Sequence, residues 1–298
     1  MRRSWIGWLF LLPALFLLGF FTMYPFIKVL DLSFREFDLK SPGKGLGRFV
    51  ALGNYRYLMR QDSQFWHSLG LTILFVVIVV TIEFFIGLGL ALLLNRDFKG
   101  KKVVVALAVA PTVMAPAAVG LMWSLAVNHE FGIVPYLLKT LGIRLQQALL
   151  GSRTTALLTV MLMDIWQWTP FMFLIMLSGL HGLPKEPYEA AQVDRASKWQ
   201  IFRLITLPLL KPLIVVALLL RVIDAFKTFD QVYVLTGGGP GDATELLALY
   251  AYRVNFRMWN LGYGAAVTLV VYFIILVVTA IFYTLTTAER KGGTVSGR

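Results

Sequence analysis

The sequence predicts an all-α integral membrane protein with six transmembrane helices. Its 298 residues are 58% hydrophobic and only 15% charged, and the mean hydropathy is +0.72, which is too apolar for an ordinary soluble domain. Apolar stretches of roughly twenty residues, each long enough to cross the hydrocarbon core as a helix, recur along the chain. Because a helix satisfies its own backbone hydrogen bonds in lipid, we interpret each stretch as a helical span.

The first apolar stretch covers residues 5–27 and follows Met1-Arg2-Arg3, which is also how a secretory signal begins. A signal has a shorter apolar core that ends in a small-x-small cleavage site, whereas this stretch continues through Phe20 and Phe21. We therefore expect an uncleaved first span whose N-terminus lies inside.

Five further spans are predicted, and the polar intervals between them are too short to form soluble cores. The whole chain, residues 1–298, is therefore expected to be a single transmembrane domain. An even number of spans places both termini on the same side of the membrane. With the N-terminus inside, Lys and Arg are denser in the inner segments than in the outer ones. The positive-inside rule therefore predicts cytoplasmic termini and a cytoplasmic loop at residues 181–212. The further spans cover residues 68–94, 103–127, 154–180, 207–235 and 262–285.

Composition excludes several classes of function. The net charge of +12 could attract nucleic acid, but in so apolar a chain basic residues mark cytoplasmic loops and contacts with membrane lipid, so no nucleic-acid partner is expected. Without cysteine there is no disulfide, thiolate nucleophile or cysteine zinc site, and the three histidines lack metal-ligand spacing. We expect no metal, no bound cofactor and no catalytic residues, since no Ser/His pair or paired-carboxylate constellation is apparent.

The inner loop contains a predicted surface helix that begins at Glu186. Glu186 and Glu189 favour the positive helix start, and Asp194 with Lys198 has i,i+4 spacing. Small alanine side chains in this segment leave a face that a partner could approach closely. A solvated connector between two spans is the alternative, and the residues by themselves leave both interpretations open.

The order and spacing of this loop resemble the EAA loop of permease subunits in bacterial and archaeal ABC importers, in the binding-protein-dependent sugar family that includes the maltose permeases. The resemblance implies a type I ABC importer permease fold, in which the loop forms a coupling helix seated on an ATP-binding subunit. The family usually has glycine directly after the aspartate, so Arg195 means that the helix ends differently or that Arg195 contacts the partner. The residues assigned to coupling are Glu189, Ala190, Ala191, Asp194, Arg195 and Ala196.

Three further segments, residues 87–96, 166–171 and 229–241, look like the same family at matching locations, so the resemblance covers nearly the whole chain. It implies a carbohydrate or polyol-like substrate, a second homologous permease subunit, an extracytoplasmic solute-binding protein and two ATP-binding subunits that hold ATP and Mg²⁺. It also implies a multi-pass location in the bacterial or archaeal plasma membrane. The chain is then a transport subunit and not an enzyme; its glycine-rich stretch lacks the Lys-Ser/Thr of a phosphate-binding loop.

Charged and polar residues within the spans form the candidate substrate pathway. Intramembrane charge costs at least about 2.5 kcal/mol, so these residues should face protein or water. From Arg221 onward, charges recur every three residues and predict a stripe that is either a salt-bridge ladder or a substrate contact. Indole faces and an amide suit a sugar, although packing is the alternative. The candidate pathway residues are Trp166, Gln167, Trp168, Asp224, Lys227 and Asp230.

The main alternative function is an ion-coupled secondary transporter of a polar solute. In that case Glu83, Asp164 and Asp224 would form the ion relay. Such a protein would need no partner subunit, and it would leave the inner loop without a role.

Overall fold

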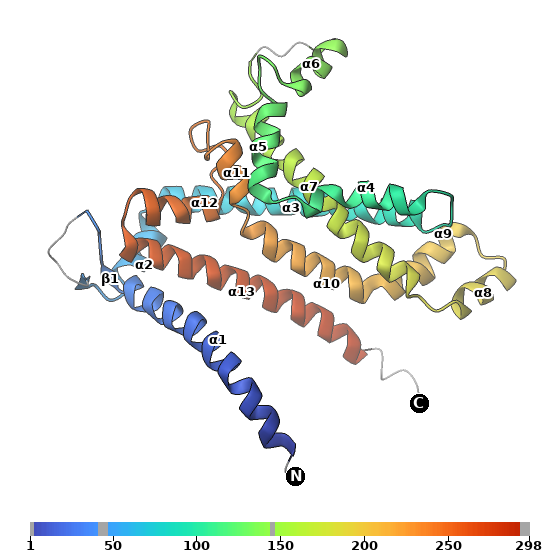
Figure 1. Ribbon diagram of the computed structural model, residues 1–298, viewed down its shortest axis with the longest axis horizontal. Helices are drawn as coiled ribbons and strands as arrows, with labels where there is room; N and C mark the ends of the chain where they lie inside the picture. Colours follow the sequence, from blue (N-terminus) through green and yellow to red (C-terminus); the bar gives the residue numbers. More distant parts are fainter. Residues whose placement is uncertain (1–2, 41–46, 144–146, 293–298) are drawn as a thin grey trace. The chain divides into compact units, whose positions relative to one another are not determined.

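The computed structural model describes residues 3–40, 47–143 and 147–292 and is mostly helical (Figure 1). Within that part of the chain, five helices are long and apolar enough to cross a membrane, or six if α4 and α5 form one bent span, in agreement with the predicted fold class. The helices are α1 (Arg3–Ser33), α2 (Gly53–Arg60), α3 (Ser63–Leu94), α4 (Lys101–Val113), α5 (Pro116–Ala126), α6 (Ile133–Thr140), α7 (Arg153–His181), α8 (Glu186–Val193), α9 (Lys198–Ile201), α10 (Leu207–Phe226), α11 (Asp230–Leu235), α12 (Leu247–Tyr252) and α13 (Leu261–Gly292), with π-helical turns at Phe202–Thr206 and Arg253–Arg257 and a small antiparallel pair of strands, β1 (Arg35–Glu36) and β2 (Arg48–Phe49).

The described chain divides into two compact units. The first consists of Met1–His67 and Tyr250–Ile274, and the second of Ser68–Leu249 and Ile275–Arg298. The chain passes from one unit to the other within α3, α12 and α13.

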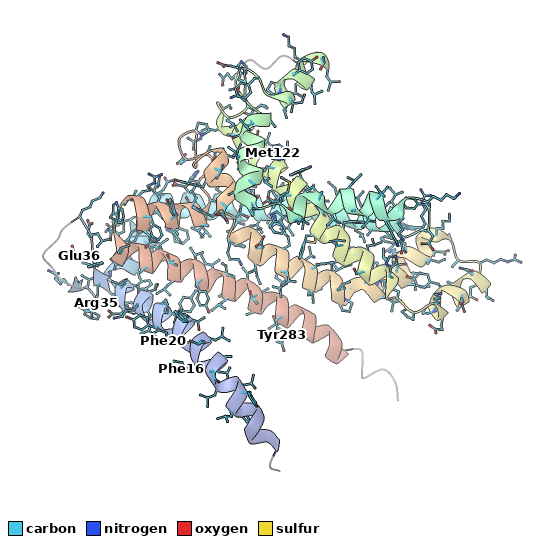
Figure 2. The ribbon with its side chains drawn as sticks, in the orientation of Figure 1. Phe16, Phe20, Arg35, Glu36, Met122 and Tyr283 are labelled. Atoms are coloured by element: carbon cyan, nitrogen blue, oxygen red, sulfur yellow. The ribbon has the colours of Figure 1, made fainter. Side chains whose placement is uncertain are left out.

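The first unit is organised around a buried carboxylate at the start of α3. Asp62 Oδ1 accepts a hydrogen bond from the backbone N–H of Phe65 at 2.9 Å and so caps the helix. Its Oδ2 accepts hydrogen bonds from the hydroxyls of Tyr250 and Tyr263. The same unit contains α1, whose apolar side chains are exposed along the helix, including Phe16 and Phe20 (Figure 2).

The second unit is built around α7, the most buried of the candidate spans. Helices α4, α5 and α10 pack on it, and α3 approaches it closely at Gly87, where an added Cβ would lie 2.7 Å from the Cβ of Met172. Close packing of this kind is typical of membrane helices, which gain little hydrophobic driving force from one another.

The third predicted span, residues 103–127, is sharply bent. Helices α4 and α5 meet at 97°, because Met114 and Ala115 are extended and Pro116, which lacks an N–H, starts the new helix. The side chain of Gln167 donates to the carbonyl of Met114 at 3.2 Å, and Thr112 donates to the carbonyl of Gln167 at 2.6 Å. Two hydrogen bonds thus hold the bend against α7.

The structure also differs from the predicted fifth span, residues 207–235. Helix α10 ends at Phe226, and α11 begins separately at Asp230. The short α11 packs on α5. The two helices are so close that a Cβ at Gly120 would lie 2.7 Å from the carbonyl oxygen of Gln231. Lys227 and Asp230 therefore do not continue the predicted stripe that begins at Arg221.

Candidate functional site

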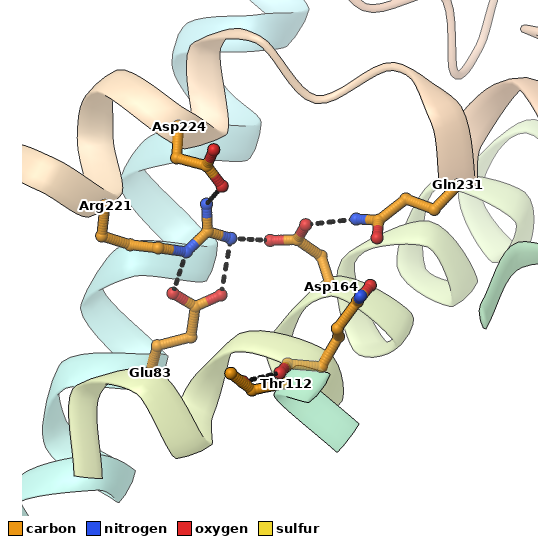
Figure 3. Close-up of polar contacts among 7 residues, drawn as sticks. Glu83, Thr112, Asp164, Arg221, Asp224 and Gln231 are labelled. Atoms are coloured by element: carbon orange, nitrogen blue, oxygen red, sulfur yellow. Dashed lines mark hydrogen bonds and ion pairs between the residues drawn. The ribbon is translucent and has the colours of Figure 1, made fainter. Parts of the chain in front are cut away.

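A fully buried ion cluster joins three helices of the second unit (Figure 3). Arg221 on α10 donates from Nε and Nη2 to the two carboxylate oxygens of Glu83 on α3, at 2.7 and 2.9 Å. Nη2 also donates to Asp164 on α7. The side chains of these three residues have no exposed surface. Because a buried charge is tolerated only when it is paired, the cluster ties α3, α7 and α10 together.

These pairings between helices were not predicted. Spacing along one helix suggested that Asp224 pairs with Arg221 or Lys227, whereas Glu83 and Asp164 lie 138 and 57 residues from Arg221 along the chain. Asp224 is a peripheral member of the cluster, with its Oδ2 3.5 Å from Arg221 Nη1 and its side chain 43% exposed. The buried ion pairs of Arg221 with Glu83 and Asp164 are thus distinct from the half-exposed carboxylate of Asp224.

Beside the ion cluster lies a small cavity of about 80 Å³. Four of the six candidate pathway residues line it, and Gln231, which donates to Asp164, joins them from α11. Gln231 is not among the predicted pathway residues, because a single glutamine carries no periodic signal. The lining residues are Pro116, Trp168, Asp224, Lys227, Thr228, Phe229, Asp230 and Gln231.

The other two candidate residues have structural contacts instead. Gln167 is fully buried and holds the bend between α4 and α5. Trp166 packs edge-on against Trp123, with ring centroids 6.2 Å apart. Of these three neighbours only Trp168 lines the cavity, because successive residues of a helix point about 100° apart.

The cavity brings an aromatic face together with unfilled hydrogen-bonding groups. The ring of Trp168 lies over Arg221, whose Cζ is 5.2 Å from the ring centroid. Gln231 Oε1 is buried and has no hydrogen-bond partner among the described residues, and the buried Arg221 Nη1 makes no hydrogen bond there beyond its 3.5 Å ion pair with Asp224. A donor, an acceptor and the Asp224 carboxylate near one indole suit a ligand that combines hydroxyls with apolar C–H faces. Within the part of the chain that the structure describes, no group of three or more His, Cys, Asp or Glu side chains could hold a metal.

The inner loop has a second, separate arrangement. The predicted helix from Glu186 to Lys198 is two helices, α8 and α9, so Asp194 and Lys198 do not have i,i+4 geometry within one helix. Helix α8 ends because Arg195 adopts a left-handed conformation with φ of +53°. The N–H of Arg195 donates to the carbonyl of Gln192 at 3.1 Å, and that of Ala196 to the carbonyl of Ala191 at 2.9 Å.

This pair of hydrogen bonds is the Schellman motif, in which glycine usually occupies the left-handed position. Arginine adopts the glycine conformation here, at a cost of roughly 1–2 kcal/mol relative to its ordinary backbone conformation. The chain then restarts at Ser197, which forms a capping box with Gln200.

The residues assigned to coupling are mostly exposed. Ala191 is buried and Ala196 is half-buried, while the other four are exposed. The hydroxyl of Tyr188 donates to Thr206 Oγ1 at 3.0 Å and anchors α8 to the start of the following long helix. Helix α8 thus exposes charged and small side chains while the hydrogen bond from Tyr188 holds the helix in place.

Comparison with known proteins gives a family match over most of the chain. The family model described as "Binding-protein-dependent transport system inner membrane component" matches residues 83–291. The trehalose/maltose transport system permease protein MalF of Thermococcus litoralis is 35% identical over 281 residues, covering 94% of this chain and 93% of that protein. The trehalose transport system permease protein SugA of Mycobacterium tuberculosis is 34% identical over 302 residues, covering 100% and 94%.

The solved structures include one with a similar fold. A chain of a bacterial ABC transporter involved in the import of the acidic polysaccharide alginate superposes with a TM-score of 0.83 and 21% identity, covering 96% of each chain. At this identity the likeness concerns the fold.

Proposed function

Since this chain belongs to the family of binding-protein-dependent transport system inner membrane components, we propose that it moves a sugar or a polyol-like solute into the cytoplasm, driven by ATP hydrolysis on partner subunits. The chain is a multi-pass ABC importer permease with the type I fold. Similarity to permeases for trehalose and maltose supports a carbohydrate substrate.

The cavity beside the ion cluster is the observation that carries the substrate proposal. Its lining includes the indole of Trp168, the Asp224 carboxylate and the side chain of Gln231, whose Oε1 has no hydrogen-bond partner among the described residues. A pyranose ring presents hydroxyls at its edge and C–H groups on its face, which match these groups. Lys227 and Asp230 line the same cavity and complete the proposed pathway.

The mechanism we propose is alternating access. The permease pairs with a second, homologous permease, with two ATP-binding subunits on the inner face and a solute-binding protein on the outer face. ATP and Mg²⁺ are held by the ATP-binding subunits, whose closure moves α8 and rotates the permeases so that the pathway opens outward. Both termini and residues 181–212 lie in the cytoplasm in this arrangement.

The ion cluster argues against the ion-coupled alternative. Glu83 and Asp164 would be two of its three relay groups, yet both carboxylates are paired with Arg221 and fully buried. A relay group must gain and lose its ion during transport, whereas separating these pairs would leave uncompensated charge in the helix bundle.

The coupling role is tested by reversing one charge on α8. Replacement of Glu189 with lysine should lower the ATPase activity stimulated by the substrate-loaded binding protein at least about tenfold, because the docked face loses a contact and gains repulsion. The measurement is ATP hydrolysis by the complete transporter in proteoliposomes, with sugar binding to the binding protein unchanged. Asp97→Lys is the control, since Asp97 is fully exposed and, within the described part of the chain, forms an ion pair with Lys101 alone. ATPase stimulation equal in parent and Glu189→Lys would identify α8 as a plain connector.

The pathway is tested at Asp224. The Asp224→Asn transporter should melt at the parent temperature, because Arg221 keeps Glu83 and Asp164, while uptake of labelled trehalose or maltose falls about tenfold through loss of a charged acceptor. Asp242→Asn is the matched control, because Asp242 pairs with the exposed Arg153 and does not line the cavity.

Trp168→Ala provides a second measurement at the same cavity. Loss of the indole face should reduce uptake of a disaccharide more than that of a small polyol. If Asp224→Asn and Trp168→Ala both give stable complexes with parental uptake and sugar preference, the cavity does not contact the substrate.

A further inference from the structure

Arg195 is in a conformation that its side chain disfavours. It occupies the left-handed position at the end of α8, with φ of +53° and both hydrogen bonds of the helix-ending motif formed. Glycine would adopt this conformation without steric conflict. A non-glycine residue in a left-handed conformation persists where the surrounding structure or a function requires it. The presence of an arginine side chain at this position therefore needs an explanation.

Nothing in the described chain holds that side chain. Arg195 is exposed, and its guanidinium forms no hydrogen bond or ion pair with any residue that the structure describes. The backbone turn is closed by main-chain groups alone, so it needs no arginine. The side chain is therefore free to contact another molecule.

The neighbours of Arg195 form a surface typical of a protein interface. Val193, two residues before it, is 83% exposed, and Trp199, four residues after it, is 66% exposed. An arginine between exposed apolar side chains matches the composition of interface centres, where aromatic residues and arginine are enriched. We call Val193, Arg195 and Trp199 the α8–α9 surface.

The charges around this surface distinguish between a membrane and a protein as its partner. Glu186, Glu189 and Asp194 are exposed on or next to α8, and so are Lys185 and Lys198. The surface is therefore not the uniformly basic one that binds anionic lipid headgroups, which would repel its acidic residues. A protein can place a carboxylate opposite the guanidinium and basic groups opposite the acidic residues, so the mixed pattern favours a protein with a complementary charge pattern.

We propose that Arg195 is a partner-selecting contact, whose guanidinium pairs with a carboxylate on the ATP-binding subunit while Val193 and Trp199 enter apolar pockets beside it. This inference rests on the proposed docking of α8 on that subunit. The planar guanidinium binds a carboxylate through two parallel hydrogen bonds, which gives directional selectivity that glycine lacks. An ATP-binding subunit without the acidic residue is then disfavoured, because Arg195 loses its water shell without gaining a partner.

The test measures binding of the purified ATP-binding subunit to the permease pair in nanodiscs of neutral phosphatidylcholine. Arg195→Gly should weaken binding about tenfold at low salt and reduce its salt dependence, and Arg195→Glu should weaken it further. Lys185→Ala, which removes a positive charge from the other end of α8, is the matched control and should stay within about twofold of the parent. The permease pair carrying Arg195→Gly should melt no lower than the parent, since glycine suits the left-handed turn, so weaker binding would not reflect misfolding.

Three outcomes would overturn the proposal. If Arg195→Gly binds like the parent while Glu189→Lys does not, α8 docks as proposed but Arg195 is not a contact. If both variants bind like the parent, the docking function itself fails. If the effect of Arg195→Gly appears only in nanodiscs that contain anionic lipid, the guanidinium binds headgroups and not the ATP-binding subunit.

Discussion

Replacing Arg221 with methionine is expected to abolish accumulation of the folded protein in the membrane. Methionine has a similar length but leaves the carboxylates of Glu83 and Asp164 buried together without a counter-charge. Removing one partner of a buried ion pair typically costs about 3–5 kcal/mol, a large fraction of the stability of most domains. The yield of monodisperse protein in detergent and its thermal unfolding measure the effect.

The control neutralises the whole cluster. Combining Arg221→Met with Glu83→Gln and Asp164→Asn removes the charges and keeps similar volumes, so much of the yield should return. A single Arg221→Met variant that expresses and melts like the parent would show that the cluster does not stabilise the helix bundle.

Replacing Asp62 with alanine is expected to have the second-largest effect on stability. Asp62 is buried, caps α3 and accepts hydrogen bonds from the hydroxyls of Tyr250 and Tyr263. Burial and the hydrogen bond to Asp62 raise the pKa of Tyr250 well above its ordinary value, so this hydroxyl remains a donor. Loss of the cap and of the acceptor for two buried hydroxyls should together cost about 3 kcal/mol, measured as a lower melting temperature of the purified permease.

A graded control separates the hydrogen bonds from the helix cap. Tyr250→Phe removes one donor and leaves Asp62 with Tyr263 and the backbone N–H of Phe65, so it should cost about 1 kcal/mol. An Asp62→Ala variant no less stable than Tyr250→Phe would mean that the carboxylate does not organise this unit.

The long helices were predictable because the membrane imposes a simple rule. A chain that crosses hydrocarbon needs at least about twenty apolar residues. Helices α3 and α7, of 32 and 29 residues, contain the predicted spans 68–94 and 154–180. The end of α10 was not predictable, since residues 227–229 contain neither glycine nor proline. Its position depends on packing of α11 against Gly120 on α5, which no local pattern encodes.

The candidate site was predicted in part for a similar reason. Trp168 and Asp224 carry chemistry that suits a sugar, and the structure places both at one cavity. The partners of Arg221 come from distant parts of the chain and could be found only in three dimensions. At the inner loop, resemblance suggested the coupling residues, but the left-handed backbone of Arg195 is not visible in a sequence because arginine normally avoids that conformation.

The bend between α4 and α5 has a consequence for biosynthesis. The carbonyl of Met114 accepts a hydrogen bond from the side chain of Gln167. The ribosome adds Gln167 to the chain 53 residues after Met114. In hydrocarbon an unpartnered carbonyl costs several kcal/mol, so a ribosome-bound chain that has reached only α5 has no protein group from α7 to satisfy it. The two halves of this segment can therefore settle into their final angle only once α7 has entered the bilayer, which makes the shape of an early span depend on the insertion of a later one.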